Sequence, residues 1–307
     1  MKNIKGSIML LITAMIWGTA FVAQSEGMNY VEPFTYNAMR TLLGGLVLIP
    51  VILIFRAAEK NSHTPVKAFS VKETAVGGIC CGVVLFIASA FQQAGIAQTT
   101  AGKAGFITAL YIVIVPLLGI FMGRRIPLRM WLFVAIAVAG FRLLCIKDDS
   151  GISRGDLLVL ICAVFFAVHI MVIDRFNGKS TDAMLMSCIQ FFTAGILHFI
   201  CMLIFEEPSA QAVFNAGYTI LYAGIMSCGV AYTLQVVGQR YTAPTVATLL
   251  MSLESVFAAL SGWLILHEKL SISELIGCVL VFAAVILAQL WGSPSSEKQT
   301  SADSSPY

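Results

Sequence analysis

Residues 6–22 read GSIMLLITAMIWGTAFV, and residues 155–171 read GDLLVLICAVFFAVHIM. Both runs are almost free of charge and continue into further apolar residues on the C-terminal side. An apolar stretch of about 18 residues or more with few charges is typical of a membrane-spanning helix. The two stretches therefore predict two helices that cross a bilayer, and their likeness indicates a repeat within the chain.

The composition extends this prediction to the whole chain. Hydrophobic residues make up 58% and charged residues 11% of the 307 residues, and the mean hydropathy is +0.88. A soluble domain carries about 25% charged residues, so the composition excludes a cytosolic enzyme and a disordered protein. The net charge is only +3, and the basic residues are dispersed, which argues against a nucleic-acid partner.

Ten apolar stretches are long enough to be spans. We expect an all-α polytopic membrane protein whose ten transmembrane helices lie at about 5–24, 34–55, 74–95, 101–121, 128–146, 155–174, 183–205, 214–237, 243–265 and 272–291. They form two five-helix units, residues 1–146 and 152–291, and the polar tail 292–307 is expected to be disordered.

The two units align along their whole length. The offset is 149 for the first span, 150 for the second and 143 for the third. Each unit has an odd number of spans, so the second enters the membrane from the opposite side. Such inverted repeats are typical of secondary transporters, whose substrate sites lie near the midplane. The aligned pairs include Gly6 with Gly155, Trp17 with Phe166, Arg40 with Gln190, Gly45 with Gly195, Gln92 with Gln235, and Gly95 with Gly238.

The distribution of basic residues predicts the orientation. If the N-terminus lies inside, only Lys103, Lys147, Arg154 and Lys269 of the 19 Lys and Arg residues fall in outer segments. The positive-inside rule then places both termini in the cytoplasm of a multi-pass protein of the cell (inner) membrane.

Several segments together resemble the ten-helix EamA-type members of the drug/metabolite transporter superfamily. The resemblance rests on IWGTAFVA (16–23), NAMRTLLGG (37–45), FQQAGIAQTTAGKAGFITALY (91–111), AYTLQVVGQRYT (231–242) and SLESVFAAL (252–260). It implies export or exchange of small metabolites, often amino acids or related compounds. It also places spans five and ten at the periphery, where they could join two copies in a homodimer. One departure is Ser255, where the family often has proline.

Two charged residues within spans are candidates for the substrate site. Glu254 lies near the middle of span nine, where a charge costs about 2.5–3.5 kcal/mol on insertion scales. It could accept a proton or bind a substrate amine, or it could be a permanently paired acid. Arg40 in span two could hold a substrate carboxylate as a bidentate fork, or its head could extend to the interface. Asn37 lies on the same helix face as Arg40. The two charges together would suit a zwitterion such as an amino acid.

The remaining candidates are uncharged. Trp17 is either a packed aromatic residue or a wall of the cavity, and Tyr111 aligns beside the position that matches Glu254. Gln92 and Gln235 either line the cavity or bind a neighbouring helix. His169 is a second proton-coupling candidate, although a buried histidine with one hydrogen bond is the commoner case. Pro116 is expected to interrupt span four.

A membrane-embedded enzyme acting on a lipid or apolar substrate is the alternative. It would need a nucleophile, a metal site or an acid pair inside the bilayer. The sequence has no H-E-x-x-H and no paired acids in neighbouring spans, and it has no C-x-x-C or zinc-like Cys/His spacing. We therefore expect a transporter without cofactor or metal, whose partners are a small-molecule substrate and the lipid bilayer.

Overall fold

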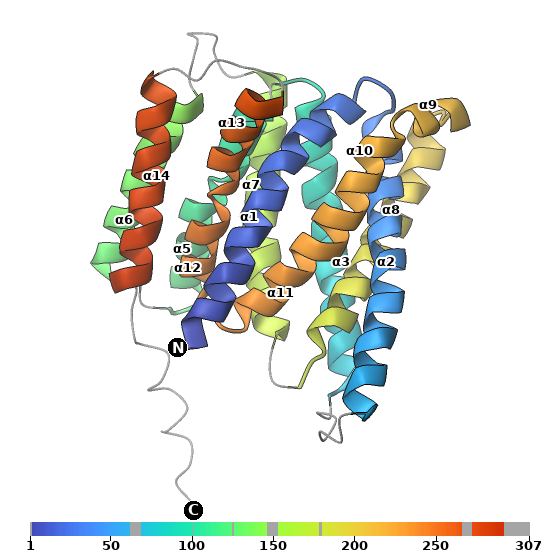
Figure 1. Cartoon of the computed structure of the whole chain (residues 1–307), viewed down its shortest axis with the longest axis horizontal. Coiled ribbons are helices and arrows are strands. Elements are labelled where there is room, and N and C mark those ends of the chain that lie inside the picture. Colours follow the sequence, from blue (N-terminus) through green and yellow to red (C-terminus); the bar gives the residue numbers. More distant parts are fainter. Residues whose placement is uncertain are drawn as a thin grey trace, which may run out of the picture.

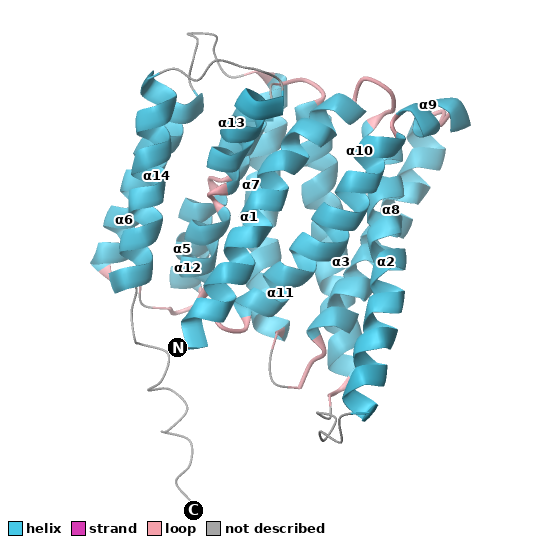
Figure 2. Cartoon of the chain, viewed as in Figure 1, coloured by secondary structure: helices cyan, strands magenta, loops and turns pink. Residues whose placement is uncertain are grey.

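The computed structural model describes residues 2–61, 69–99, 101–124, 126–145, 153–177, 180–265 and 272–291. Every regular element in these ranges is helical (Figure 2). Helices are expected because a backbone in lipid must satisfy its own hydrogen bonds. The tail predicted to be disordered, 292–307, lies outside the described residues.

The first half holds α1 (Lys2–Gly27), α2 (Pro33–Asn61), α3 (Val71–Ile96), α4 (Ala101–Thr108), α5 (Tyr111–Phe121) and α6 (Leu128–Cys145). The second half holds α7 (Arg154–Phe176), α8 (Ala183–Phe205), α9 (Ala210–Asn215), α10 (Gly217–Leu221), the π-helix η1 (Tyr222–Tyr232), α11 (Thr233–Gln239), α12 (Pro244–Met251), α13 (Glu254–Ile265) and α14 (Ile272–Trp291).

These helices confirm the ten predicted spans. Spans four, eight and nine are each built from more than one helix. Eight spans hold a continuous stretch long and apolar enough to cross a membrane; the other two, in α6 and α14, have shorter apolar stretches, Leu128–Gly140 and Leu275–Leu287. The chain is therefore a multi-pass, all-α membrane protein.

The helices stand side by side in one bundle (Figure 1). The pair α6 and α14 lies at one end of it, and α2 packs on α8 towards the other end. Between them, α3 packs on α7 while α1 packs on η1, α11 and α13. Exchanging the two halves maps the α6–α14 and α2–α8 contacts onto themselves and the α3–α7 contact onto that of α1 with η1 and α11, as expected for repeats related by a twofold axis. The contact of α1 with α13 likewise maps onto that of α7 with α4 and α5.

Glycine contacts show this symmetry at the level of single residues. A Cβ at Gly45 of α2 would lie 3.1 Å from the ring of Phe192 in α8. Its counterpart Gly195 of α8 faces Leu42 of α2, where a Cβ would lie 2.7 Å from the side chain. Since Leu42 and Phe192 also align at an offset of 150, the axis passes through the α2–α8 contact.

The third span of each half repeats a second contact. A Cβ at Gly95 in α3 would lie 2.9 Å from the carbonyl oxygen of Gly155, and a Cβ at Gly238 in α11 would lie 3.2 Å from that of Gly6. Small residues let helix backbones approach closely in membranes. The four aligned glycines therefore confirm the offsets read from the sequence and the inverted arrangement of the halves.

Spans four and nine break at equivalent positions. Helix α4 ends before Ala109–Leu110, and α12 ends before Ser252–Leu253. At both breaks, backbone hydrogen bonds join residues three apart instead of four, such as Ile112 N to Ala109 O at 3.0 Å. The expectation that Pro116 interrupts span four is wrong, because Pro116 lies inside α5, more than one helical turn beyond the break. A proline is not required, since the second break has none beside it.

Candidate functional site

A cavity lies in the middle of the bundle. Its lining comes from both halves of the chain and consists of Trp17, Phe21, Gln24, Arg40, Gln92, Thr108, Tyr111, Phe166, Ser227, Tyr232 and Glu254. Two aligned pairs, Trp17 with Phe166 and Tyr111 with Glu254, line the same cavity. The cavity is therefore on the axis that relates the repeats, where transporters of this architecture place their substrate.

The two helix breaks bring Tyr111 and Glu254 together. Tyr111 is the first residue of α5, and Glu254 is the first residue of α13. The Tyr111 hydroxyl donates a hydrogen bond of 3.0 Å to Glu254 Oε1, and the two side chains are 2% and 3% exposed. The half-helices that begin at the two breaks thus meet at a buried carboxylate.

Arg40 is held in place by its own helix. Its Nε donates to Asn37 Oδ1 at 2.8 Å, and its guanidinium carbon lies 5.7 Å from the ring centre of Tyr36. Among the described residues, the Nη groups have no hydrogen-bond acceptor and no ion-pair partner. Because Arg40 is only 4% exposed and lines the cavity, its free edge is available to a ligand there.

The charges of Arg40 and Glu254 therefore lie in one cavity without pairing. Within the described part of the chain, no ion pair involves either residue. An unpaired buried charge is costly in a low-dielectric interior. One cation from the first half and one carboxylate from the second leave the cavity able to bind a ligand that carries both signs of charge.

Aromatic side chains line the same cavity as these charges. The rings of Trp17 and Tyr232 lie 4.7 Å apart and tilted by 60°, and Phe166 lines the cavity nearby. The Trp17 indole N–H is buried without a hydrogen-bond partner in the part of the chain that the structure describes. Tyr232 is the last residue of η1, and Ser227 also comes from η1, so the π-helix contributes two lining residues. Segments of π-helix frequently occur at functional sites.

The structure places the other sequence candidates differently. Asn37 does not line the cavity but binds Arg40. Gln92 lines it and donates to Thr108 Oγ1 at 3.3 Å, whereas its counterpart Gln235 lies buried in α11 outside it. His169 also lies outside, where its Nε2 is 3.1 Å from Gln190 Oε1.

Six lining residues were missed from the sequence: Phe21, Gln24, Thr108, Phe166, Ser227 and Tyr232. For four of them a signal was present. Phe166 aligns with Trp17, and Phe21, Thr108 and Tyr232 belong to segments that carry the family resemblance. Gln24 and Ser227 resemble ordinary residues of apolar helices, and only their tertiary contacts distinguish them.

A G-x-S-x-G pattern at residues 151–155 bears on the enzyme alternative, because that pattern carries the nucleophile of many hydrolases. Ser153 is instead the N-cap residue of α7. Its hydroxyl accepts a bond of 3.0 Å from Asp156 N, and the Asp156 carboxylate accepts one of 2.9 Å from Ser153 N. This reciprocal capping box gives the serine a structural role at the helix start.

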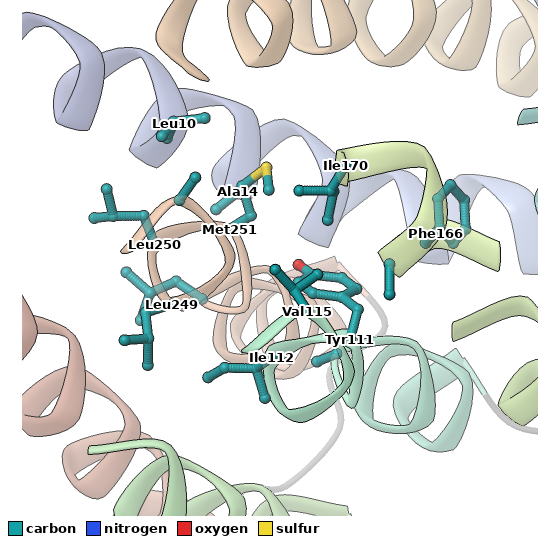
Figure 3. Packing of buried hydrophobic residues seen from close by; sticks show 14 of the residues in the cluster. Leu10, Ala14, Tyr111, Ile112, Val115, Phe166, Ile170, Leu249, Leu250 and Met251 are labelled. Carbon is teal, nitrogen blue, oxygen red and sulfur yellow. The ribbon is translucent and has the colours of Figure 1, made fainter. Parts of the chain in front are cut away.

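Apolar packing closes the bundle on the side of the N-terminus. Figure 3 shows Leu10, Ala14, Val115, Ile170 and Met251, from four different helices, packed around Tyr111. The cavity has a volume of about 30 Å³. A single buried water needs about 10–15 Å³ on this measure, so the cavity has room for two or three waters.

Comparisons with known proteins agree with this geometry. The chain matches the EamA-like transporter family over residues 4–146 and 153–290. It is 29% identical to an uncharacterized transporter of Archaeoglobus fulgidus, over 94% of this chain and 87% of the relative, and 23% identical to the protein PecM of Dickeya dadantii, over 89% of both.

A solved crystal structure has the same fold. Its TM-score is 0.74 at 20% sequence identity, with 93% of this chain and 96% of the other covered. The family match spans both five-helix halves and almost all of the helical chain. The chain therefore belongs to the EamA-like transporter family, and it is a membrane transporter.

Proposed function

We propose that the protein is a secondary transporter that exports small zwitterionic metabolites, such as amino acids or related compounds, by alternating access. The observation that carries the proposal is the pair of unpaired opposite charges, Arg40 and Glu254, in one central cavity. Arg40 binds the substrate carboxylate through its free Nη edge, and Glu254 binds the substrate amine. Bidentate Arg–carboxylate pairs are among the strongest hydrogen bonds that proteins make.

The size of the cavity supports a change of conformation during transport. The cavity has room for two or three waters, fewer than the non-hydrogen atoms of an amino acid, so we expect the helices to separate when a substrate enters. The breaks at Ala109–Leu110 and Ser252–Leu253 are the places where spans four and nine can bend with the least loss of hydrogen bonds. Since they are related by the repeat, bending one while the other closes would expose the cavity to alternate sides.

Glu254 also offers a route to proton coupling. Its Oε1 accepts the Tyr111 hydroxyl, while Oε2 has no hydrogen-bond partner within the described residues. A proton and a substrate amine would then compete for the same carboxylate. Such competition exchanges one for the other across the membrane, in line with export driven by proton entry.

Release of metabolites from cells tests the proposal. Cells expressing wild type, Glu254→Gln or Arg40→Gln at equal membrane levels are compared by mass spectrometry of the medium. Gln keeps the size of Glu254 and can still accept the Tyr111 bond, so the fold should persist. We expect cells with wild type to release one class of zwitterion. The amount released should be at least tenfold lower with either variant.

Glu26→Gln is the matched control, because Glu26 does not line the cavity and its carboxylate accepts hydrogen bonds from Asn29 and Tyr30 and interacts with Tyr218. It should export like wild type. If wild type changes no extracellular zwitterion under several growth conditions, export of this class is wrong. If release persists in both cavity variants, the assignment of the two charges is wrong.

We also propose that the protein lies in the cell membrane with both termini in the cytoplasm, as the distribution of Lys and Arg suggests. A green fluorescent protein fused after Tyr307 tests the side on which the C-terminus lies. It folds and fluoresces if it stays in the cytoplasm, and it stays dark if it crosses the membrane in unfolded form. Fluorescent cells are expected. Dark cells with normal amounts of the fusion would reverse the orientation.

A further inference from the structure

A chain of hydrogen bonds runs from Arg40 away from the cavity and through three helices. Arg40 Nε donates to Asn37 Oδ1 at 2.8 Å, and Asn37 Nδ2 donates to the carbonyl oxygen of Ser89 in α3 at 2.9 Å. The Ser89 hydroxyl in turn lies 2.8 Å from Nε2 of His198 in α8. Asn37, Ser89 and His198 are each at most 1% exposed.

The bonds of Ser89 decide where the hydrogen of His198 lies. Ser89 Oγ is 2.6 Å from the carbonyl oxygen of Leu85, which can only accept. The single hydroxyl hydrogen satisfies that carbonyl, so the bond to His198 requires Nε2–H to donate. Nδ1 then carries no hydrogen, which agrees with its burial without a hydrogen-bond partner among the residues that the structure describes. A charged imidazolium would leave that second N–H donor without a partner there.

The surroundings of His198 give its ring no other polar partner among the described residues. Phe86 meets it edge-on with ring centres 4.7 Å apart, and Phe34 lies at 6.1 Å. A leucine would fill such an apolar site without the cost of burying a polar ring. The bond to Ser89 is therefore the feature that distinguishes histidine here from an apolar residue.

We propose that His198 is a positioning residue for carboxylate recognition: through Ser89 and Asn37 it fixes the orientation of Arg40. The bond between His198 Nε2 and Ser89 Oγ ties α8 to α3 at the residue whose backbone carbonyl accepts Asn37 Nδ2, and this holds that carbonyl where it fixes which end of the Asn37 amide faces Arg40. The guanidinium then keeps Nε towards the protein and both Nη groups towards the ligand. The inference rests on the proposed function only in assigning a carboxylate to Arg40.

The first test needs no substrate. The purified full chain is labelled with ¹⁵N-histidine, and the four histidine signals are assigned by single variants. The His198 ring is expected as the Nε2–H tautomer. A second sample is labelled with ¹⁵N-arginine, and the Arg40 Nε–H signal is identified by its loss in Arg40→Lys. The hydrogen of this group is expected to exchange with solvent about tenfold faster in His198→Leu than in wild type.

Rescue and a packing control separate positioning from general damage. His198→Gln keeps an N–H donor near Nε2 and should restore slow exchange. Thr193→Val removes a hydroxyl from the same helix that binds only Ile189 O, outside the chain from Arg40 to His198. It should leave the exchange of Arg40 as in wild type.

The second test measures what the positioning is for. Melting temperatures are recorded with increasing concentrations of each of the common L-amino acids and of its methyl ester, which keeps the amine but lacks the carboxylate charge. The preference of wild type for the acid over the ester should fall about tenfold in His198→Leu. In an Arg40→Lys background, His198→Leu should have no further effect, because the two act as a unit.

The outcomes are distinguishable. An Nδ1–H tautomer, unchanged exchange in His198→Leu, or an equal loss of acid preference in Thr193→Val would each overturn the positioning role. Faster exchange with rescue by His198→Gln supports it even if no amino acid raises the melting temperature of wild type. That last result would instead refute the proposed substrate class.

Discussion

Removing the Tyr111 hydroxyl measures the charge of the carboxylate at the centre of the protein. Tyr111→Phe keeps the ring, which packs among the apolar residues of Figure 3, and deletes only the donor to Glu254 Oε1. The bond is 3.0 Å long and both side chains are almost fully buried.

The expected cost depends on the acceptor. A hydrogen bond to a charged group contributes about 1.5–3 kcal/mol, and one between neutral groups about 0.5–1.5 kcal/mol. Tyr111→Phe should therefore reduce the free energy of unfolding by about 2 kcal/mol when Glu254 is ionised. In a Glu254→Gln background the acceptor is neutral, and the cost should fall to about 1 kcal/mol.

The assay is unfolding in mixed detergent micelles, applied to the four chains of a double-mutant cycle. The difference of about 1 kcal/mol between the two backgrounds is the expected coupling. If Tyr111→Phe costs the same in both backgrounds, the carboxylate is not ionised in the resting protein. If it costs less than about 0.5 kcal/mol in wild type, the contact between the two half-helices does not stabilise the fold, and the reasoning from the helix breaks fails.

Three further predictions follow from single contacts. Gly95→Ala should lower the free energy of unfolding by about 1–3 kcal/mol, because the added methyl group overpacks against α7. Gly102→Ala is the control, because a Cβ there meets nothing within 4 Å. Equal melting temperatures of the two variants would refute the close contact at Gly95. Ser255→Pro should cost about 1 kcal/mol more than Ser255→Ala in a thermal melt, because it removes the bond of 3.2 Å from Ser255 N to Ser252 O at the start of α13, whereas in an unbroken span nine the same change would cost about 3 kcal/mol. Glu206→Gln should lower the free energy of unfolding by about 1 kcal/mol, because the Glu206 carboxylate caps the start of α2. Glu207 is exposed, and Glu207→Gln should leave the melting temperature unchanged.

The spans and their inverted order were predictable because a bilayer imposes long apolar runs, and because five spans per half leave only one relative orientation. The aligned glycines were equally visible, and their contacts confirm the offsets at Gly45, Gly195, Gly95 and Gly238. What the sequence established is thus the part of the structure that depends on hydrophobicity and on repetition.

The helix breaks could not be located from composition. Pro116 suggested an interruption at the wrong place, since neither break depends on a proline beside it. The different positions of Gln92 and Gln235 were equally hidden, because aligned residues in two repeats need not keep the same neighbours. Arg40 and Glu254 were identified as buried charges, but only the fold shows that they share a cavity.

The π-helix has a consequence for insertions and deletions. Gly82 of α3 packs on Thr193, and Gly224 of η1 packs on Leu43, which aligns with Thr193. At Gly224, near the start of η1, the repeat offset is therefore 142, while Gly95 and Gly238, beyond η1, align at 143. Span eight has gained one residue relative to span three, and the wider turns of η1 absorb it. Deleting one residue elsewhere in a span rotates the side chains beyond the deletion onto a different face of the helix. Deleting one residue between 222 and 232 would instead leave both flanking helices in register with the other half.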